Sequence, residues 1–402
     1  MYMVRQVLFI CYWGIEDVLT ASTVLPWVRK LEQLPAIHQI VLTTMEREGS
    51  CNVLTSDKTK HVPLYPKLLG SPLLSKISDF IDLPSQLIKI AKDHTIDLII
   101  AYSSPAGALA HKVCMQTHIP YLVGSFEPHA DYMVESGVWS KYGLKYLFQK
   151  RWEQKQKLSA SGLMPVAESY KYKLWQEEVP REKIMTVPCA VDLMLFQFDK
   201  TARIAVRERL GIAPEAIVGI YVGKYGGLYY EQEAFHIYQK CFQFFPAFYL
   251  IILSPQEPTA IAQLINKNRL PAERIYTAYV PHKEIPAYLS ASDVAFATFK
   301  PGLSKIYLSP VKIGEYWANG LPVLLTEGVG DDSNIIKREG GGAVYNLAEE
   351  DSLDRALQEI QQMVGDATHR ERIPLLAKQY RSFDKVTKAL QYFLEAQEHK
   401  KQ

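Results

Sequence analysis

The sequence has no long hydrophobic run, no close pair of cysteines and no excess of either charge. No stretch approaches the ~20 apolar residues of a membrane-spanning helix, so a transmembrane protein is not expected. The scattered set Cys11, Cys51, Cys114, Cys189 and Cys241 fits neither a disulfide framework nor a zinc knuckle, and it favours reduced thiols in a cytoplasm. Because 45 basic and 43 acidic residues leave a net charge of only +2, nucleic acid is not the expected partner.

The 402 residues, 48% of them hydrophobic, are typical of a globular protein with two or three domains. Short β-rich runs alternate with longer helical stretches, which predicts an α/β fold with parallel sheets. Strands are expected at 7–12, 37–43, 97–103, 120–125, 217–222, 248–253, 274–279, 294–298 and 322–326. We expect domains at 1–190 and 191–375, with a C-terminal amphipathic helix in 376–402 packing back on the first domain.

The most informative stretch runs from residue 307 to residue 323. Ser309 suits a helix N-cap, and Pro310 suits the first helical position. Lys312 then lies in the first turn, where the helix dipole disfavours a cation, and a bound anion would remove that conflict. Free N–H groups beside a lysine make a diphosphate site, with Glu315 one turn further on, within reach of a sugar hydroxyl. An ordinary surface helix is the alternative on these features alone.

A glycine-rich loop follows the expected strand at 217–222. It reads Gly223-Lys224-Tyr225-Gly226-Gly227 and leads into a helical stretch. Glycines let backbone N–H groups approach a phosphate closely, and Lys224 supplies positive charge. Together with the stretch at 309–315, this loop would form the second half of a clamp on one diphosphate.

Both segments resemble the donor-binding segments of the family 4 glycosyltransferases. These are retaining enzymes of the GT-B fold, in which two Rossmann-like, doubly wound domains face each other across a cleft. In that family two glutamates are separated by seven residues, and the second binds the ribose of the nucleotide sugar. Glu315 matches the second glutamate, and Tyr307 stands where the first is usual. The order of residues is similar to a bacterial sub-branch with a Ser-Pro-x-Lys-x-x-Glu-Tyr pattern.

The resemblance implies a set of donor-binding residues in the second half of the chain. They are Gly223, Lys224, Tyr307, Ser309, Pro310, Val311, Lys312 and Glu315, of which Lys224 and Glu315 are also expected to be catalytic. The segment at 280–293 is similar to the family's nucleobase pocket, with Val280 and Ile285 as lining residues. There, we interpret His282 as a solvent-exposed residue at a helix start and Asp293 as a structural turn residue.

The first half of the chain carries the expected acceptor side. Glu127 and His129 follow the strand at 120–125, and a residue leaving the carboxyl end of a parallel strand points into the cleft of a doubly wound sheet. The family often has a histidine there, so His129 is a catalytic candidate, with a purely structural histidine as the alternative. Trp13 would stack on a sugar face, and Gly14 would allow the backbone to approach the leaving phosphate.

The resemblance implies transfer of a sugar from a nucleotide-diphosphate donor to a hydroxyl of a glycan or lipid-linked acceptor, with retention. The enzyme would be a hexosyltransferase of bacterial surface polysaccharide or glycan synthesis. It would need no cofactor and no metal, since the Asp-x-Asp motif of the other large glycosyltransferase fold is absent. The alternatives are a nucleotide-sugar epimerase of the same fold and a catalytically silent scaffold that binds nucleotide sugar.

The segment at 139–157 is strongly basic. It has six Lys and Arg residues and one acidic residue, Glu153, a local charge of +5, and aromatic side chains are interleaved with them. Basic and aromatic residues on one helix can lie at an anionic lipid surface, which would hold this cytoplasmic protein peripherally on the inner face of the plasma membrane. The interpretation that we favour is a solvated helix with one face in the core.

Overall fold

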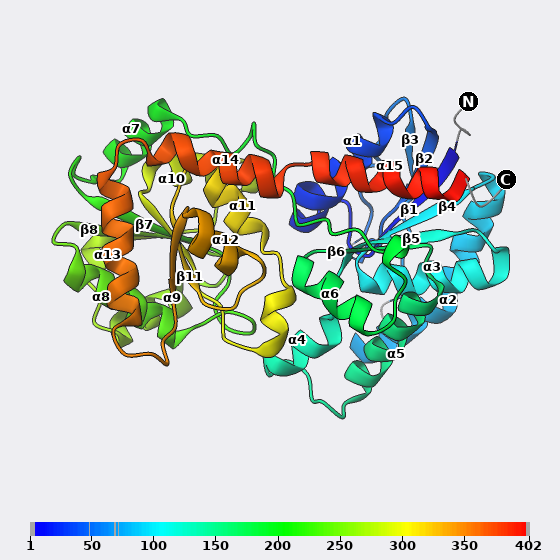
Figure 1. Ribbon diagram of the computed structural model, residues 1–402, viewed down its shortest axis with the longest axis horizontal. Helices are drawn as coiled ribbons and strands as arrows, with labels where there is room; N and C mark the ends of the chain where they lie inside the picture. Colours follow the sequence, from blue (N-terminus) through cyan, green and yellow to red (C-terminus); the bar gives the residue numbers. More distant parts are fainter. Residues whose placement is uncertain (1–4, 48, 68–69, 71, 399–402) are drawn as a thin grey trace. The chain divides into compact units, whose positions relative to one another are not determined.

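The computed structural model describes residues 5–47, 49–67, 70 and 72–398, which form two compact α/β units (Figure 1). The first unit comprises Met1–Val134, Trp139–Ala190 and Phe383–Gln402. The second comprises Glu135–Val138 and Val191–Ser382. The chain therefore leaves the first unit near residue 190 and returns to it for the last helix.

The first unit is built on a parallel sheet of six strands in the order β3-β2-β1-β4-β5-β6. The strands are β1 (Arg5–Cys11), β2 (Ile37–Thr43), β3 (Thr59–His61), β4 (Leu98–Tyr102), β5 (Tyr121–Phe126) and β6 (Gly162–Pro165). Every residue of β4 is buried, which explains its continuous apolar sequence, because helices cover both faces of the sheet.

The second unit repeats this strand order. Its sheet runs β12-β11-β10-β7-β8-β9, which is the first order counted from β7 instead of β1. The strands are β7 (Ile217–Val222), β8 (Phe248–Leu253), β9 (Ile275–Ala278), β10 (Val294–Ala297), β11 (Val323–Thr326) and β12 (Gly342–Tyr345). In each sheet the order reverses once, between β1 and β4 and between β7 and β10. A doubly wound sheet binds its ligands at the carboxyl edge of this switch point.

Helices cover both faces of each sheet (Figure 1). Those of the first unit are α1 (Leu25–Glu32), α2 (Pro72–Asp93), α3 (Ser104–Thr117), α4 (His129–Glu135), α5 (Leu144–Ser159), α6 (Glu168–Gln176) and α15 (Asp384–Glu398). Those of the second are α7 (Lys200–Arg209), α8 (Gln232–Phe244), α9 (Pro258–Lys267), α10 (Ile285–Ala291), α11 (Val311–Ala318), α12 (Asp332–Glu339), α13 (Ser352–Gly365) and α14 (His369–Arg381). Single turns are η1 (Thr20–Val24), η2 (Arg181–Lys183), η3 (Ala272–Arg274), η4 (His282–Glu284) and η5 (Leu303–Tyr307). None of the described helices combines the length and apolar character that crossing a membrane requires.

The C-terminal helix α15 completes the core of the first unit. Its buried side chains Val386, Leu390 and Phe393 belong to one hydrophobic cluster with Trp27 and Leu31 of α1. The periodic spacing of these residues gives α15 one apolar face, and that face is covered. The returning segment begins at Phe383, and α14 belongs to the second unit.

The predicted fold class, α/β with two Rossmann-like doubly wound domains, is confirmed. The sequence prediction missed three strands, β3, β6 and β12, each of which lies at an edge of its sheet. Edge strands are paired on one side only and can be short and polar, as in Thr59–His61, or contain glycine and proline, as in Gly162–Pro165. Their sequences therefore lack the apolar runs that reveal central strands.

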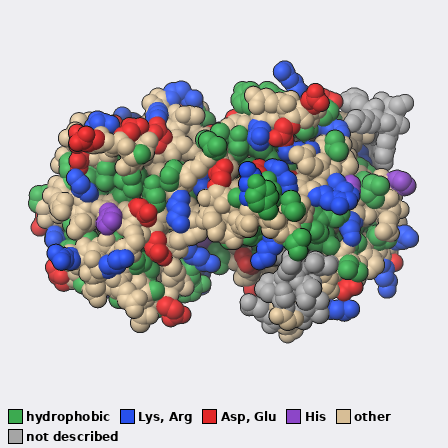
Figure 2. Space-filling model, turned by 90° about the horizontal axis from the view of Figure 1, so that it is seen from below, with side chains coloured by type: hydrophobic (Ala, Val, Ile, Leu, Met, Phe, Trp, Pro, Cys, Tyr) green, Lys and Arg blue, Asp and Glu red, His purple; other side chains and the backbone are tan. Residues whose placement is uncertain are grey.

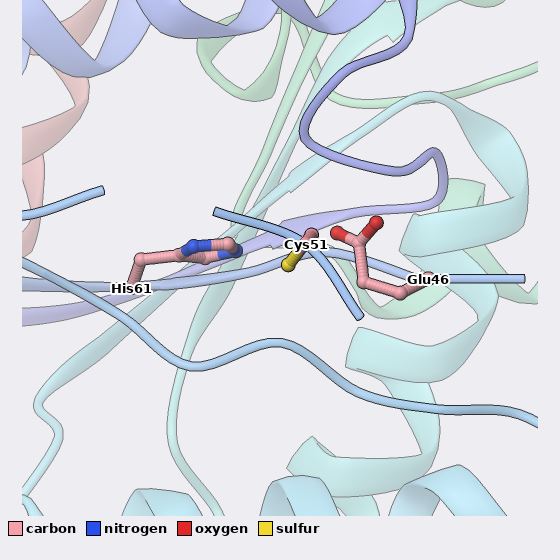
Figure 3. Close-up of side chains that lie close together, drawn as sticks. All are labelled: Glu46, Cys51 and His61. Carbon is pink, nitrogen blue, oxygen red and sulfur yellow. The ribbon is translucent and has the colours of Figure 1, made fainter. Parts of the chain in front are cut away.

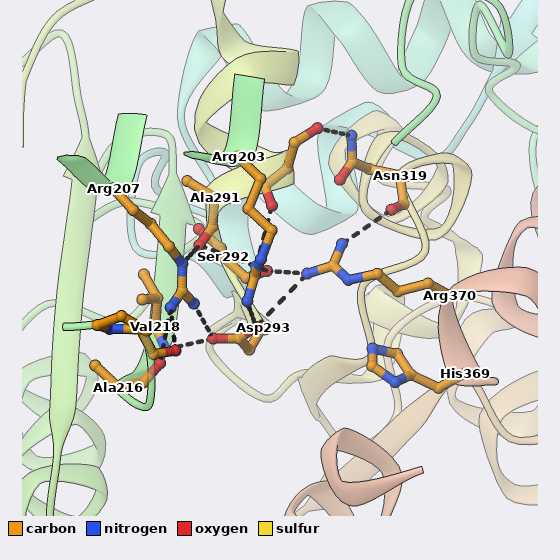
Figure 4. A network of polar contacts seen from close by, with 12 residues as sticks. Arg203, Arg207, Ala216, Val218, Ala291, Ser292, Asp293, Asn319, His369 and Arg370 are labelled. Atoms are coloured by element: carbon orange, nitrogen blue, oxygen red, sulfur yellow. Dashed lines mark hydrogen bonds and ion pairs between the residues drawn. The ribbon is translucent and has the colours of Figure 1, made fainter. Parts of the chain in front are cut away.

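Asp293, which directly precedes β10, holds three arginines together (Figure 4). Its Oδ1 accepts from Arg203 at 2.7 Å and its Oδ2 from Arg207 at 2.5 Å, while Arg370 of α14 lies 3.7 Å away. The same carboxylate accepts the Val218 N–H at 2.9 Å. Burial lowers the pKa of Arg370 to about 10, and Asp293 opposes that shift. Asp293 therefore fixes α7 and α14 at the amino edge of the sheet, away from the carboxyl ends where the candidate donor residues lie.

Candidate functional site

The candidate donor site lies at the switch point of the second sheet. Gly223 follows β7 with a φ of +142°, a conformation that residues other than glycine rarely adopt. An added Cβ there would lie 2.7 Å from the Lys312 Nζ, so the side chain of Lys312 reaches directly to this loop. The Val222 N–H at the end of β7 donates to the Tyr316 hydroxyl at 3.1 Å, which ties α11 to the same strand end. The structure thus brings together the two halves of the predicted phosphate clamp at Gly223 and Lys312.

The start of α11 differs from the prediction. The helix begins at Val311 with Pro310 as its N-cap residue, so the prediction that Ser309 caps it is wrong. The Ser309 hydroxyl instead accepts from Arg381, whose guanidinium also binds Asp332. No side chain caps the helix, so the cap does not occupy the N–H groups of its first turn.

The Nζ of Lys312 is buried among aromatic rings and has no hydrogen-bond partner among the described residues. It lies 4.8 Å from the ring centre of Tyr221, 4.3 Å from that of Tyr229 and 5.8 Å from that of Phe299. Cation–π attraction compensates only part of the cost of removing an ammonium group from water. Burial therefore lowers the pKa of Lys312 to about 7, although the charge of Glu315 opposes the shift. A buried amine without a hydrogen-bond partner beside a glycine loop makes this position a candidate anion site.

Glu315 is oriented by a residue that we interpreted from the sequence as solvent-exposed. The Nε2–H of His282 donates to the Glu315 Oε1 at 2.9 Å, and the His282 ring packs on Phe196 with 5.3 Å between ring centres. This hydrogen bond to the carboxylate raises the pKa of His282, against the effect of burial. The carboxylate of Glu315 is thereby fixed, with its second oxygen outside this pair.

The other predicted donor residues lie in the loops and helices next to these elements along the chain. Lys224 follows Gly223 directly and its side chain is exposed. Tyr307 ends η5 and is half-buried. Val280 precedes η4, and Ile285 begins α10 with its side chain buried. Their roles in binding a donor stay predictions.

The predicted acceptor residues belong to the first unit and form a group of their own. Trp13 and Gly14 follow β1, and the Trp13 ring packs on Tyr102 with 6.1 Å between ring centres. An added Cβ on Gly14 would lie 2.8 Å from a carboxylate oxygen of Glu46, so a side chain there would displace that carboxylate. Glu46 also accepts the Ile15 N–H at 2.9 Å, and this bond holds the loop after β1.

Tyr132 links the two candidates that follow β5. Its hydroxyl donates to the Glu127 carboxylate at 3.0 Å and is bonded to the His129 Nδ1. Because the phenol proton is directed at Glu127, the phenol oxygen accepts from His129 Nδ1–H, which defines the tautomer of His129. Desolvation raises the pKa of Glu127 to about 7, and the bond from Tyr132 opposes that shift.

Three side chains of metal-ligand type, Glu46, Cys51 and His61, lie close together in the first unit (Figure 3). Their ligand atoms are within 4.8 Å of one another. The His61 Nε2 is hydrogen-bonded to the Thr44 hydroxyl at 2.7 Å, and its Nδ1 accepts the Leu54 N–H at 3.3 Å. Thr44 in turn donates to Glu46. Since both ring nitrogens of His61 are engaged, this cluster acts as a hydrogen-bonded support for the loop at Gly14.

Sequence reasoning missed His282 as a partner of Glu315 and the aromatic surround of Lys312. Tyr221 is the second-to-last residue of β7, Tyr229 follows the glycine loop and Phe299 follows β10. Their common position near the ends of neighbouring strands is a signal that the sequence contains, because these strand ends meet at one edge of the sheet. The contact of His282 with Glu315 bridges 33 residues and has no local signal.

No protein-family model matches the chain, and no curated protein matches its sequence. Solved structures do match its fold. The sucrose-phosphate synthase of Thermosynechococcus elongatus superposes with a TM-score of 0.73 at 14% identity, covering 99% of this chain and 100% of that one. Anabaena HepE, solved with UDP and glucose, gives a TM-score of 0.70 at 14% identity, covering 98% of this chain and 100% of that one. WaaG, a glycosyltransferase involved in lipopolysaccharide biosynthesis, gives 0.67 at 13% identity, covering 93% and 95%.

The fold also occurs in an epimerase. UDP-GlcNAc 2-epimerase from Neisseria meningitidis, bound to UDP-GlcNAc, gives a TM-score of 0.63 at 11% identity, covering 97% of this chain and 100% of that one. At these identities the likeness establishes the fold, and the chain is a GT-B protein in that structural sense. What the fold does in this chain has to be argued from its residues.

Proposed function

We propose that this protein is a retaining glycosyltransferase of the family 4 type, which moves a hexose from a nucleotide-diphosphate donor to an acceptor hydroxyl. The observation that carries the proposal is Lys312, whose buried Nζ has no hydrogen-bond partner in the described structure and reaches the Gly223 loop at the switch point. An ammonium group held there is complementary to a diphosphate. HepE, solved in complex with UDP and glucose, and the glycosyltransferase WaaG have the same fold.

The chemistry required of the second unit is stabilisation of charge on the leaving diphosphate. Lys312, Lys224 and the N–H groups at the start of α11 would share that charge, which in a site poor in water is worth far more than in solution. Glu315, oriented by His282, would accept from the ribose hydroxyls, and Val280 and Ile285 would contact the nucleobase. On this proposal the leaving phosphate oxygen takes the proton of the acceptor on the same face of the sugar, so the chain supplies no nucleophile.

The first unit would orient the acceptor. His129, fixed by Tyr132, would hydrogen-bond to sugar hydroxyls, with Glu127 behind it, while Trp13 would stack on a sugar face. Gly14 would bring the loop after β1 close to the donor phosphate. Orientation of two substrates lowers the barrier by supplying in advance the entropy that their encounter costs.

We further propose a role in bacterial surface polysaccharide or lipid-linked glycan synthesis, at the cytoplasmic face of the membrane. The similarity of fold to WaaG, named for lipopolysaccharide biosynthesis, and the basic segment at 139–157 support this role. No cofactor or metal is required on this proposal, so EDTA should leave transfer unchanged. Loss of all activity on chelation would count heavily against it.

Nucleotide-sugar binding tests the proposal directly. A panel of UDP-, GDP-, ADP- and CMP-sugars is screened for thermal stabilisation, because a ligand that binds only the folded state at 100 times its Kd adds about 2.7 kcal/mol to the free energy of unfolding. The stabilising donor is then incubated with candidate acceptors, and NMR of the product reports the anomeric configuration. Transfer with inversion would refute the retaining mechanism, and no stabilisation by any nucleotide sugar would refute the donor site.

An epimerase is the second candidate, because UDP-GlcNAc 2-epimerases have the same fold. It would convert the nucleotide sugar without any acceptor, so incubation of the donor alone separates the two functions. A new nucleotide sugar in that sample identifies an epimerase. A protein that binds the donor and leaves it unchanged with every acceptor is the silent scaffold.

A further inference from the structure

An apolar cavity of about 350 Å³ lies in the first unit, at the switch point of its sheet. Two of its lining residues follow neighbouring strands of the sheet, β1 and β4. They are Tyr12, directly after β1, and Pro105, at the start of α3 after β4. Phe80 and Phe148 close it from α2 and α5, with 5.0 Å between their ring centres. The volume is within the roughly 300–1,000 Å³ typical of small-molecule sites. The cavity is therefore at the edge of the sheet where this fold binds ligands.

The rim of the cavity is apolar and basic at once. Leu144 and Leu147 of α5 line it although their side chains are 70% and 52% exposed, and Lys145 and Arg151 alternate with them. The only acidic residue of the segment at 139–157, Glu153, is buried, so its carboxylate does not offset the surface charge. Figure 2, seen from the side where α4 and α5 lie in Figure 1, shows hydrophobic and basic side chains next to each other on this part of the surface.

Two of the six basic residues of this segment have acidic partners. Lys150 pairs with Asp131 at 2.6 Å, and Lys157 pairs with Glu177. Lys145 and Arg151 at the cavity rim form no ion pair with any described residue. Their charges are directed to solvent beside exposed leucines, an arrangement that matches a ligand with an anionic head and an apolar chain.

The cavity is connected to the candidate acceptor group through Trp139. The Trp139 ring lines the cavity and packs on the ring of His129 with 5.4 Å between ring centres. Tyr12 on the cavity wall is the residue before Trp13, a second candidate on the acceptor side. The cavity wall is therefore continuous with residues proposed to orient the acceptor.

We infer that this cavity binds the hydrocarbon chain of a phosphate-bearing lipid, with Lys145 and Arg151 on the phosphate, and that this lipid carries the acceptor. The role of this lipid as acceptor rests on the proposed function, while the lipid-binding site rests on the cavity and its rim alone. A glycan without a lipid would leave both the apolar wall and the exposed leucines uncovered. A membrane surface alone would be contacted by the exposed face of α5 and would not need the cavity.

Calorimetric titration with n-decyl phosphate, kept below its critical micelle concentration, tests the site. Saturable binding at one site per chain is expected, with inorganic phosphate and decanol each binding at least tenfold more weakly. Leu147→Ser should lower the affinity for decyl phosphate about tenfold, because it removes most of the apolar side chain that contacts the hydrocarbon. Leu158→Ser is the matched control, since Leu158 lies on the same helix, is 79% exposed and does not line the cavity.

The charge of the rim is tested with Lys145→Gln/Arg151→Gln against Lys385→Gln/Lys388→Gln on α15, which changes the net charge equally. The double variant at the rim should lower the affinity for decyl phosphate several-fold at low salt and much less at high salt, because salt screens exposed charges. The second pair should bind as wild type. Equal weakening by both pairs would show a non-specific charge effect and overturn the assignment of the phosphate to the rim.

Anionic vesicles and UDP-glucose complete the experiment. Two outcomes would refute lipid binding in the cavity and favour a membrane surface instead. One is equal affinity of Leu147→Ser and Leu158→Ser for decyl phosphate, and the other is binding to vesicles without any binding of decyl phosphate. Thermal stabilisation by nucleotide sugars, measured on the same samples, also shows that each variant is folded. If nucleotide sugars stabilise the protein and decyl phosphate does not bind, the proposed transferase survives and the lipid site fails. The reverse result would leave the lipid site and remove the donor site.

Discussion

The two sheets have the same strand order, and their switch points differ in chemistry. At β7 and β10 the second unit places a glycine loop, three aromatic rings and one buried ammonium group, Lys312. At β1 and β4 the first unit places an apolar cavity with Tyr12 on its wall and the carboxylate of Asp79 bonded to Tyr12 at 2.7 Å. One scaffold thus presents a buried amine at one switch point and an apolar cavity at the other, since the loops after the strands determine the chemistry.

The difference extends to how each site is satisfied before a ligand binds. In the first unit the Asp79 Oδ2 also accepts from Arg47 at 2.7 Å, and Glu127 accepts from Tyr132, so each carboxylate has a donor, although the Asp79 Oδ1 has none among the described residues. In the second unit Lys312 has no acceptor in the part of the chain that the structure describes. The second switch point is therefore the one that should gain most from a charged ligand.

The largest effect is expected for Lys312→Met, which removes the charge from the second switch point and keeps the apolar stem. UDP affinity should fall by about 100- to 1,000-fold, because a preorganised charge in a dry site is lost. The free energy of unfolding should rise by about 1–4 kcal/mol, because an apolar residue replaces a buried charge. Titration calorimetry and denaturant unfolding measure the two effects, with the exposed Lys224→Met as the comparison for stability. A destabilised variant with wild-type affinity would contradict the anion site.

Glu315→Ala should lower kcat/KM about 10- to 100-fold with the fold intact, since it removes the charged carboxylate that would accept hydrogen bonds from the ribose hydroxyls of the nucleotide sugar. The matched variant in the first unit is Glu127→Gln, which should leave UDP affinity unchanged and alter only acceptor use. Transfer rates and UDP binding are compared in both proteins. If Glu127→Gln weakens UDP binding as much as Glu315→Ala does, the assignment of the donor to the second unit and the acceptor to the first is wrong.

Donor binding should weaken as the pH rises through neutrality. Burial puts the pKa of Lys312 at about 7 in the free protein, and a bound diphosphate would raise it, so binding takes up a proton. From pH 7 to pH 8 the protonated fraction of Lys312 falls about fivefold, and UDP affinity should fall by the same factor. Lys312→Met should remove most of this dependence, leaving the part due to His282. An affinity for UDP that is constant over this range would show that Lys312 does not bind the phosphates.

The smallest effect is expected for His282→Asn, which acts through Glu315 as a positioning change. The KM for the donor should rise about three- to tenfold with kcat nearly unchanged, as for a hydrogen bond that orients a charged group. The pKa of His282 is raised above 6.5, so its pair with Glu315 stabilises the fold fully below about pH 6.5 and is lost as pH rises through the folded pKa. The difference in Tm between wild type and variant should therefore shrink from pH 6 to pH 8, and a constant difference would indicate packing on Phe196 instead.

The sequence was sufficient for the central strands, because apolar runs are local signals. It also predicted that the glycine loop and the start of α11 come together, as Gly223 and Lys312 do, while their role as a phosphate clamp stays a prediction. It was insufficient for β3, β6 and β12, three of the four edge strands, and for the start of α11, where Arg381 donates to the Ser309 hydroxyl. It also gave no access to the His282–Glu315 pair or to the cavity beside Tyr12. Such features arise when segments far apart in the chain come together, and periodicity carries no information about them.

The return of α15 to the first unit has a consequence for synthesis of the protein. Val386, Leu390 and Phe393 belong to the core that Trp27 of α1 also occupies. A ribosome that has released residues 1–190 has therefore not yet made all of that core, whereas the second unit is complete once Ser382 has emerged. Although domains generally fold in the order in which they are translated, this chain should finish its second domain before its first.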